Sequence, residues 1–172
     1  MQGGVRGFTL VELMITIVVA AIVLALAIPS FRTMIQNNRI TAQANELVTA
    51  LSLARSEAIK RGSPVTVCAS DNQSDCNTAD WTQGWILFTD DETGAGAPMI
   101  NTILRVWGPL DGAPTITTSP AGVEFVRYLG SGQVGAVVSF THTIPDCKGD
   151  QVRVIGVALT GRTSVTRLSC PP

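Results

Sequence analysis

Apolar residues form one long run near the start of the chain, and their spacing changes after it. From Phe8 to Ile28 the only residue with a formal side-chain charge is Glu12. About 20 consecutive apolar residues are enough for a helix that crosses a bilayer. The pattern therefore predicts a helix over residues 8–28 that lies in a membrane or in the core of a filament.

Residues 29–62 remain compatible with a helix, but their apolar positions fall on one side of it. These positions recur at alternating steps of four and three residues: Ile40, Ala44, Leu47, Leu51, Ala54 and Ala58. Such spacing is typical of an amphipathic helix, and Gly62 followed by Pro64 predicts its end. We expect one helix from Phe8 to Arg61, about 80 Å long. The alternative is two helices broken at the proline that opens this segment.

Residues 63–172 contain short runs with the period of β-strands, separated by turns rich in Gly, Pro, Asp and Asn. The candidate strands are Pro64–Ala69, Trp85–Thr89, Ile103–Trp107, Val123–Leu129, Ala136–His142, Val152–Leu159 and Ser164–Leu168. No helical pattern lies between them, so we expect mainly antiparallel sheets and an α+β fold, with the long N-terminal helix packed on a β-rich globular domain. Gly161 and Arg162 are predicted to form a two-residue type II′ hairpin.

A carboxylate in an apolar helix is costly, so Glu12 requires a physical reason. Cleavage between Gly7 and Phe8 would supply one, because it creates an α-amino group about one helical turn from Glu12. The same cleavage would remove Arg6, leaving 11 basic against 13 acidic residues and moving the formal net charge from −1 to −2. This weakly acidic balance is not typical of a nucleic-acid-binding protein.

The N-terminal pattern resembles that of type IV pilins and type II secretion pseudopilins. Gly7 is followed by Phe8-Thr9-Leu10-Val11-Glu12, an apolar stretch and then Pro29. The resemblance implies that residues 1–7 are a leader removed by a prepilin peptidase and that Phe8 is then N-methylated. It also implies that Glu12 neutralises the N-terminus of a neighbouring subunit during filament assembly, and that Pro29 kinks the helix. The competing interpretation is a signal anchor with an incidental Glu12. An ordinary signal peptide fits less well, because no A-x-A-like cleavage site follows the apolar run.

Features further along the chain narrow the resemblance to the FimT and FimU minor pilins and the H-type pseudopilins. They are A-R-S-E-A at residues 54–58, V-T-V-C at 65–68, G-W-I-L-F at 84–88 and the glycine–arginine turn at 161–162. This implies a minor subunit in the initiating or tip complex of a type IV pilus or a secretion pseudopilus. Such a protein crosses the bacterial inner membrane once, holds residues 63–172 in the periplasm and has other pilins or pseudopilins as partners. We expect no enzymatic activity, cofactor or small-molecule substrate.

Four cysteines follow the apolar run, and an even number of thiols outside the cytoplasm suggests disulfides. Of the three possible pairings, we favour Cys68 with Cys76 and Cys147 with Cys170. The second bond would close a loop of about 24 residues, worth roughly 3 kcal/mol. A zinc site is the competing interpretation. It is disfavoured because the chain has no C-x-x-C pair and its single histidine, His142, has no ligand-like spacing to the cysteines.

A basic group near the C-terminus raises a second function, DNA binding for natural transformation. DNA-binding FimT-type pilins carry a G-R-x-R turn, whereas this chain has Gly161-Arg162-Thr163-Ser164 and therefore only the first arginine. The candidate DNA-binding residues are Arg162, Arg167 and Lys148. Because binding to phosphates through a few arginines is modest and sensitive to salt, we prefer a solvated hairpin without a DNA role.

The remaining motifs favour structural interpretations. Residues 130–135 match G-x-G-x-x-G, but a strand pattern follows where a dinucleotide site needs a helix, so we expect a hairpin loop. His142 has no catalytic partners, and we interpret it as a strand-end residue. The acidic stretches 71–75 and 90–92 lack the spacing of a calcium loop and are expected to be solvated. Trp85 and Trp107 are predicted core residues, and Trp81, in a loop, is the candidate for a contact with another subunit.

Overall fold

The computed structural model describes residues 7–94 and 96–171, except for the side chains of residues 26, 29 and 30. The predicted leader therefore lies outside the described residues apart from Gly7. The helix α1 (Leu10–Arg61) has 52 residues and its backbone remains helical at position 29. The chain divides into two compact units, residues 1–37 and residues 38–172.

The first unit consists of the start of α1, and its large apolar side chains are exposed all along the helix. Phe8 is 79% exposed, and Leu10, Ile15, Val19 and Val23 are each more than half exposed. Judged by length and hydropathy, no helix in the described part of the chain qualifies as a membrane span.

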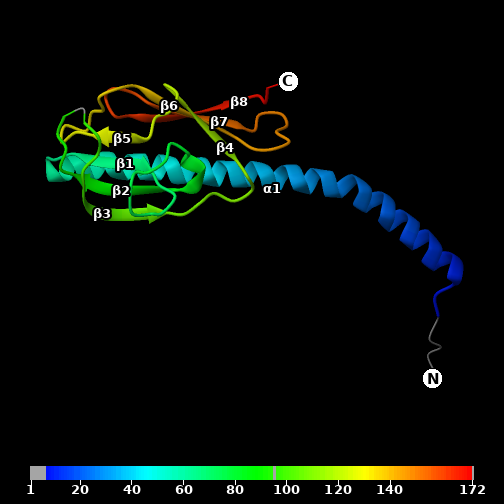
Figure 1. Ribbon diagram of the computed structural model, residues 1–172. Coiled ribbons are helices and arrows are strands. Elements are labelled where there is room, and N and C mark those ends of the chain that lie inside the picture. The colour runs from blue at the N-terminus through cyan, green and yellow to red at the C-terminus, as the bar shows by residue number, and fades with distance from the viewer. Residues whose placement is uncertain (1–6, 95, 172) are drawn as a thin grey trace. The chain divides into compact units, whose positions relative to one another are not determined.

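The second unit places two four-stranded antiparallel sheets beside the rest of α1 (Figure 1). Sheet A has the strand order β3-β2-β1-β5, and sheet B has the order β4-β6-β7-β8. The strands are β1 (Val65–Ala69), β2 (Trp85–Asp90), β3 (Ile100–Trp107), β4 (Thr115–Ser119), β5 (Phe125–Tyr128), β6 (Val138–Thr143), β7 (Val152–Val157) and β8 (Thr163–Leu168). Every strand pair is antiparallel, which confirms the predicted α+β fold.

Seven of these strands coincide with predicted ones, and β4 was not predicted. Its sequence, T-I-T-T-S, has one large apolar residue, Ile116, so the apolar alternation that marks a half-buried strand is weak. The strand forms because β-branched residues suit an extended backbone. Strand β4 lies at the edge of sheet B and pairs only with β6, so few of its side chains need to be buried.

The core lies between α1 and the two sheets. All six residues of the predicted helix stripe, Ile40 to Ala58, are buried. Several of them are alanines, whose small side chains let the sheets approach the helix closely. Five of the six, Ala44, Leu47, Leu51, Ala54 and Ala58, pack in one cluster with Leu87 and Tyr128 of sheet A and with Phe140 and Ile155 of sheet B. The amphipathic pattern in the sequence thus identified the helix face on which the domain folds.

Trp81 belongs to this core, so its predicted role in a contact with another subunit is wrong. It lies in the short 3-10 helix η1 (Trp81–Gln83) and is completely buried. Its indole Nε1 donates a 2.7 Å hydrogen bond to the carbonyl of Val123, and its ring contacts Phe140 edge-on at 4.8 Å between centroids. Trp81 can be buried although its segment is polar, because its indole N–H has a backbone hydrogen-bond acceptor in the core.

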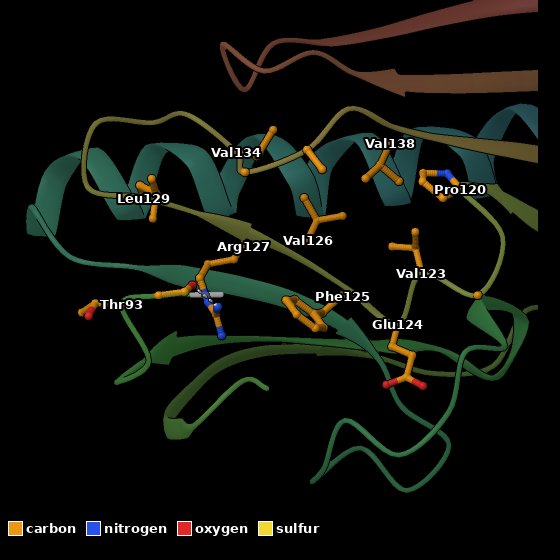
Figure 2. Close-up of a pocket in the computed structure, with 14 residues that line it drawn as sticks. Thr93, Pro120, Val123, Glu124, Phe125, Val126, Arg127, Leu129, Val134 and Val138 are labelled. Atoms are coloured by element: carbon orange, nitrogen blue, oxygen red, sulfur yellow. Dashed lines mark hydrogen bonds between the residues drawn. The ribbon is translucent and has the colours of Figure 1, made fainter. Parts of the chain in front are cut away.

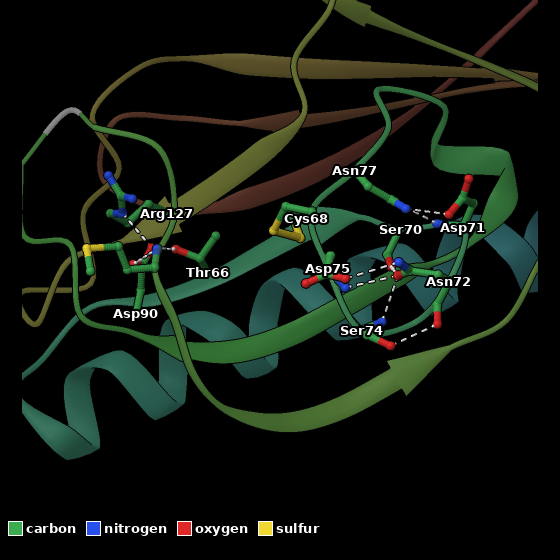
Figure 3. Close-up of a disulfide and its surroundings, with 12 residues drawn as sticks. Thr66, Cys68, Ser70, Asp71, Asn72, Ser74, Asp75, Asn77, Asp90 and Arg127 are labelled. Carbon is green, nitrogen blue, oxygen red and sulfur yellow. Dashed lines mark hydrogen bonds and ion pairs between the residues drawn. A yellow bond between two sulfur atoms is a disulfide. The ribbon is translucent and has the colours of Figure 1, made fainter.

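The favoured disulfide pairing is confirmed. Cys68 bonds to Cys76 and Cys147 bonds to Cys170, and no cysteine in the described chain is free. The first bond holds the loop after β1 against the outer face of sheet A, where Cys68 packs with Ile86 and Phe88 (Figure 3). Strand β1 is therefore covered on both faces, which explains why all five of its residues are buried.

We expect replacement of Cys147 and Cys170 together by serine to lower the free energy of unfolding by roughly 3 kcal/mol, because the unfolded chain regains the entropy of an open loop. Both cysteines are only half-buried, so little packing is lost with the sulfurs. Urea unfolding of the full chain in detergent measures the change. A loss below about 0.5 kcal/mol would show that the cross-link does not stabilise the fold.

The hairpin between β7 and β8 differs from the predicted two-residue turn. Ala158 and Arg162 flank a three-residue loop, with the amide of Ala158 donating to the carbonyl of Arg162 at 3.0 Å. Gly161 is the last loop residue and has a φ of 74°, which is the left-handed conformation that such loops require at this place. Its Cα also abuts the carbonyl of Gly132, where any Cβ would clash. The G-x-G-x-x-G segment is a loop, as predicted, but it connects β5 of sheet A to β6 of sheet B and does not join two paired strands as a hairpin would.

Candidate functional site

Glu12 lies in the first turn of α1 and caps the helix to which it belongs. The amide of Thr9 donates to Glu12 Oε2 at 3.4 Å, and the amide of Glu12 donates to Thr9 Oγ1 at 3.2 Å. The threonine hydroxyl also contacts the carboxylate at 3.2 Å. This reciprocal arrangement is a capping box, which satisfies amides that have no partner within the helix. The T-x-x-E spacing could have revealed it, and sequence reasoning missed it.

The carboxylate of Glu12 is exposed in the first turn of an apolar helix. The helix surface around it consists of residues such as Phe8, Leu13 and Ile15, each more than half exposed. A helix that is apolar on all sides is stable only when lipid or other protein covers it. The described residues of the first unit supply no such cover.

A buried ion pair lies at the end of β2. Arg127 Nε contacts Asp90 Oδ2 at 2.8 Å, with the two side chains 7% and 0% exposed (Figure 3). Thr66 Oγ1 donates to the same oxygen at 2.7 Å, and the amides of Glu92 and Met99 donate to Oδ1. Burial alone would raise the pKa of Asp90, but these hydrogen bonds outweigh it and lower the pKa.

The arginine of this pair also holds the loop between β2 and β3. Its two terminal nitrogens donate to the carbonyls of Gly94 and Gly96 at 2.7 to 3.1 Å. The prediction that residues 90–92 are solvated is therefore wrong for Asp90, which serves the structure. The described residues hold no group of acidic, histidine or cysteine side chains arranged for a metal ion.

The three predicted DNA-binding residues do not form one cluster. Arg162 lines a small cavity of about 230 Å³ together with Arg55 of α1. Arg167 lines a second cavity of about 240 Å³ together with Arg153 of β7. Lys148 belongs to the loop between β6 and β7 and lines neither cavity. Sequence reasoning missed Arg55, because it reaches Arg162 from α1, far away in the sequence.

His142 is buried, not merely placed at a strand end. It is 1% exposed in β6, and neither ring nitrogen has a hydrogen-bond partner among the described residues. It stands directly opposite Arg153 of β7, which in turn stands opposite Arg167 of β8. Burial, reinforced by the Arg153 guanidinium, lowers the pKa of His142 to about 4.

This shift makes stability depend on pH. Below its ordinary pKa of 6.5 the histidine binds a proton in the unfolded chain but stays neutral in the folded one down to about pH 4. The folded state therefore loses stability as pH falls through this window, by at most roughly 3 kcal/mol. We expect His142→Phe to remove this part of the pH dependence, measured by urea unfolding of both proteins at pH 7 and pH 4. If both proteins lose the same free energy of unfolding between pH 7 and pH 4, His142 is not the source of this pH dependence.

The largest cavity described, about 650 Å³, is apolar and lies beside β5 (Figure 2). Val123, Val126, Val134 and Val138 line it. Its charged lining residues are Glu124 and Arg127, and the arginine is committed to Asp90.

The sequence itself matches two families. Residues 43–161, more than half of the chain, match the Type II transport protein GspH family. The chain belongs to the GspH family. Residues 4–28 match the prokaryotic N-terminal methylation motif. A comparison with curated proteins found no match.

Solved structures agree with this assignment at the level of the fold. The chain is similar to the type IV minor pilin FimU of Pseudomonas aeruginosa, with a TM-score of 0.60 and 21% identity over 75% of this chain and 89% of FimU. It is also similar to the minor pseudopilin EpsH of the Vibrio cholerae type 2 secretion system. That match has a TM-score of 0.50 and 15% identity over 75% of this chain and 97% of EpsH. The resemblance to minor pilins and pseudopilins predicted from the sequence is thereby confirmed.

Proposed function

We propose that this GspH-family chain is a minor pilin or pseudopilin of the initiating or tip complex of a type IV pilus or type II secretion pseudopilus. The observation that carries the proposal is a methylation motif that leads into a helix with exposed apolar side chains along its length and one carboxylate in its first turn. Such a helix requires a cover of lipid before assembly and of other subunits after it.

The mechanism follows from the charges at the helix end. A prepilin peptidase cuts after Gly7, and residues 8–28 hold the chain in the inner membrane with residues 63–172 in the periplasm. The new N-terminus at Phe8 is then a cation in apolar surroundings. Glu12 of one subunit pairs with the amine of its neighbour, so that each charge offsets the other's desolvation. Apolar packing between helices supplies most of the cohesion, and Pro29 allows the helix to bend.

The experiment is removal of the gene from its native bacterium, followed by complementation with an epitope-tagged chain. Counting surface filaments and measuring secreted proteins separates a pilus role from a secretion role. The proposal predicts that one of the two is lost without the chain and that the tagged chain fractionates with sheared filaments or with cross-linked pseudopilins. Normal filaments and normal secretion in the deletion strain would overturn it.

A further inference from the structure

Strand β5 forms one edge of sheet A, and its outer side is open over most of its length. Among the described residues β5 has one neighbouring strand, β1, and a single isolated bridge, Tyr128 with Val134, lies on its other side. The opposite edge strand, β3, contains two register shifts, whereas the pairing of β5 is regular. Bulges make an edge less able to accept another strand, so β5 is the better suited of the two edges.

The register of β5 directs the backbone amides of Phe125 and Arg127 away from β1. The amide of Ala69 donates to the carbonyl of Glu124 at 2.9 Å, so these two residues form a hydrogen-bonded pair. Such pairs alternate with non-hydrogen-bonded pairs along an antiparallel ladder. Phe125 and Arg127 therefore belong to non-hydrogen-bonded pairs with β1, and neither amide has a partner among the described residues. Two unpaired amides, two residues apart, face the same side.

The apolar cavity of about 650 Å³ lies along this open side (Figure 2). The bridge places Val134 on the outer side of β5, and Gly135, Ala136 and Val138 continue the wall that faces the strand. Val126, Val134 and Val138 are only 3–6% exposed, whereas Gly135 and Ala136 are exposed. We call this cavity the β5 groove.

We propose that the β5 groove binds an extended segment of a neighbouring subunit, which adds to sheet A as a strand beside β5. The proposal rests on the proposed function, because it names a contact within the assembled filament. The segment accepts hydrogen bonds from the amides of Phe125 and Arg127, and apolar side chains at its alternate positions contact the valines of the groove. Since β5 has four residues, a partner segment of about four residues, roughly 13 Å long, covers it.

The open amides favour a peptide over a lipid acyl chain as the occupant. An acyl chain could fill the apolar groove, but it would leave both amides without an acceptor. A strand supplies a backbone carbonyl at every residue and also places every second side chain on the same face. A peptide with β-branched apolar residues at alternate positions therefore satisfies both the strand edge and the valine lining.

The charge at the groove indicates one further property of the peptide. The charged lining residues are Arg127, which is paired with Asp90, and Glu124, which is exposed and takes part in no ion pair within the described chain. Figure 2 shows the Glu124 carboxylate pointing away from the valines of the groove. A basic residue that follows the apolar positions of the partner segment can reach this carboxylate. The partner segment is therefore apolar at alternate positions and basic at one end.

The first test uses the full chain in detergent with the fluorescent peptide Thr-Val-Thr-Val-Thr-Lys. Two analogues carry backbone N-methyl groups, one on its two valines and the other on its second and third threonines. In a strand, residues that share a face also direct their amides to the same edge, so each analogue blocks one edge only. We expect one analogue to bind about tenfold more weakly than the other. Equal affinities of the two analogues would overturn the proposal, because a merely apolar site does not distinguish the edges.

Variants of the chain locate the binding. Gly135→Trp adds a side chain to the wall of the groove at a position where a Cβ meets no atom within 4 Å, and we expect it to weaken the peptide about tenfold. Val137→Trp is the matched control, because Val137 is 57% exposed and does not line the groove. Glu124→Gln should weaken the peptide about twofold, as for an exposed ion pair. Urea unfolding checks that each variant is folded, and unchanged binding by a folded Gly135→Trp chain would contradict the proposal.

The second test separates the strand proposal from the proposed function. A photo-crosslinking amino acid replaces Ala136, which is exposed and lines the groove, and the control carries it at Val137. In the native bacterium we expect position 136 to crosslink to another subunit, at a segment that mass spectrometry shows to be apolar at alternate positions. If the chain assembles but position 136 gives no such crosslink, only the strand proposal fails. If the wild-type chain never assembles, the proposed function fails.

Discussion

Replacing Glu12 by glutamine is expected to leave the chain in the membrane but to abolish its incorporation into filaments. Glutamine keeps the shape of glutamate and can complete a capping box at the same position, so helix α1 should still begin at its normal residue. What glutamine lacks is the negative charge that would pair with a neighbour's amine. An uncompensated ammonium buried in the filament core costs several kcal/mol, which is enough to exclude the subunit. Quantitative blotting of the sheared filament fraction against the membrane fraction measures the effect.

The control for this experiment is Thr9→Ala. This change removes the hydroxyl that contacts the carboxylate and that accepts from the amide of Glu12. The carboxylate itself remains. The loss of a cap costs about 1 kcal/mol of helix stability, so we expect incorporation to persist. If Thr9→Ala prevents incorporation and Glu12→Gln does not, then Glu12 acts by capping the helix and the charge-pairing mechanism is wrong.

Arg127→Met is expected to destabilise the folded domain by about 3–5 kcal/mol. The change leaves the buried carboxylate of Asp90 without its charged partner, and removal of one member of a buried pair has costs of this size. It also frees the carbonyls of Gly94 and Gly96, so the loop between β2 and β3 loses its attachment. Urea unfolding of the full chain at pH 7 measures the loss. Methionine replaces the arginine stem with an unbranched apolar side chain, so the change removes mainly the charge and its hydrogen bonds.

The matched control is Arg61→Met, because Arg61 forms an ion pair of the same 2.8 Å length with Glu57. That arginine side chain is 41% exposed, against 7% for Arg127. Exposed helix pairs contribute about 0.3–0.5 kcal/mol, so the control should be nearly neutral. Equal effects of the two variants would mean that burial does not determine the strength of these pairs.

Most of the fold could be predicted from the spacing of apolar residues along the sequence. The helix stripe from Ile40 to Ala58 and seven strands could be predicted, because burial on one face imposes a spacing that a single sequence displays. Strand β4 and the burial of Trp81 could not be predicted, because both depend on residues that are distant in the sequence. Ile116 has too few apolar neighbours to display a pattern, and the indole of Trp81 is drawn inward by the carbonyl of Val123.

The candidate sites were predictable only where their residues are adjacent in sequence. The methylation motif and Glu12 could be identified directly because the chemistry occupies a few consecutive positions. The cavity shared by Arg55 and Arg162 could not be predicted, because these residues meet only where α1 packs against the β7–β8 hairpin. The pairing of Arg127 with Asp90 was hidden for the same reason, and Asp90 was therefore assigned to a solvated loop.

Mass spectrometry of the chain isolated from assembled filaments tests the central claim most directly. The account predicts an N-terminal peptide that begins at Phe8 and carries a methyl group on its α-amine. This end is the cation that Glu12 of a neighbouring subunit is proposed to meet. Assembled material in which Met1 to Gly7 are still attached would contradict the account, because no α-amine would then exist at the start of the helix.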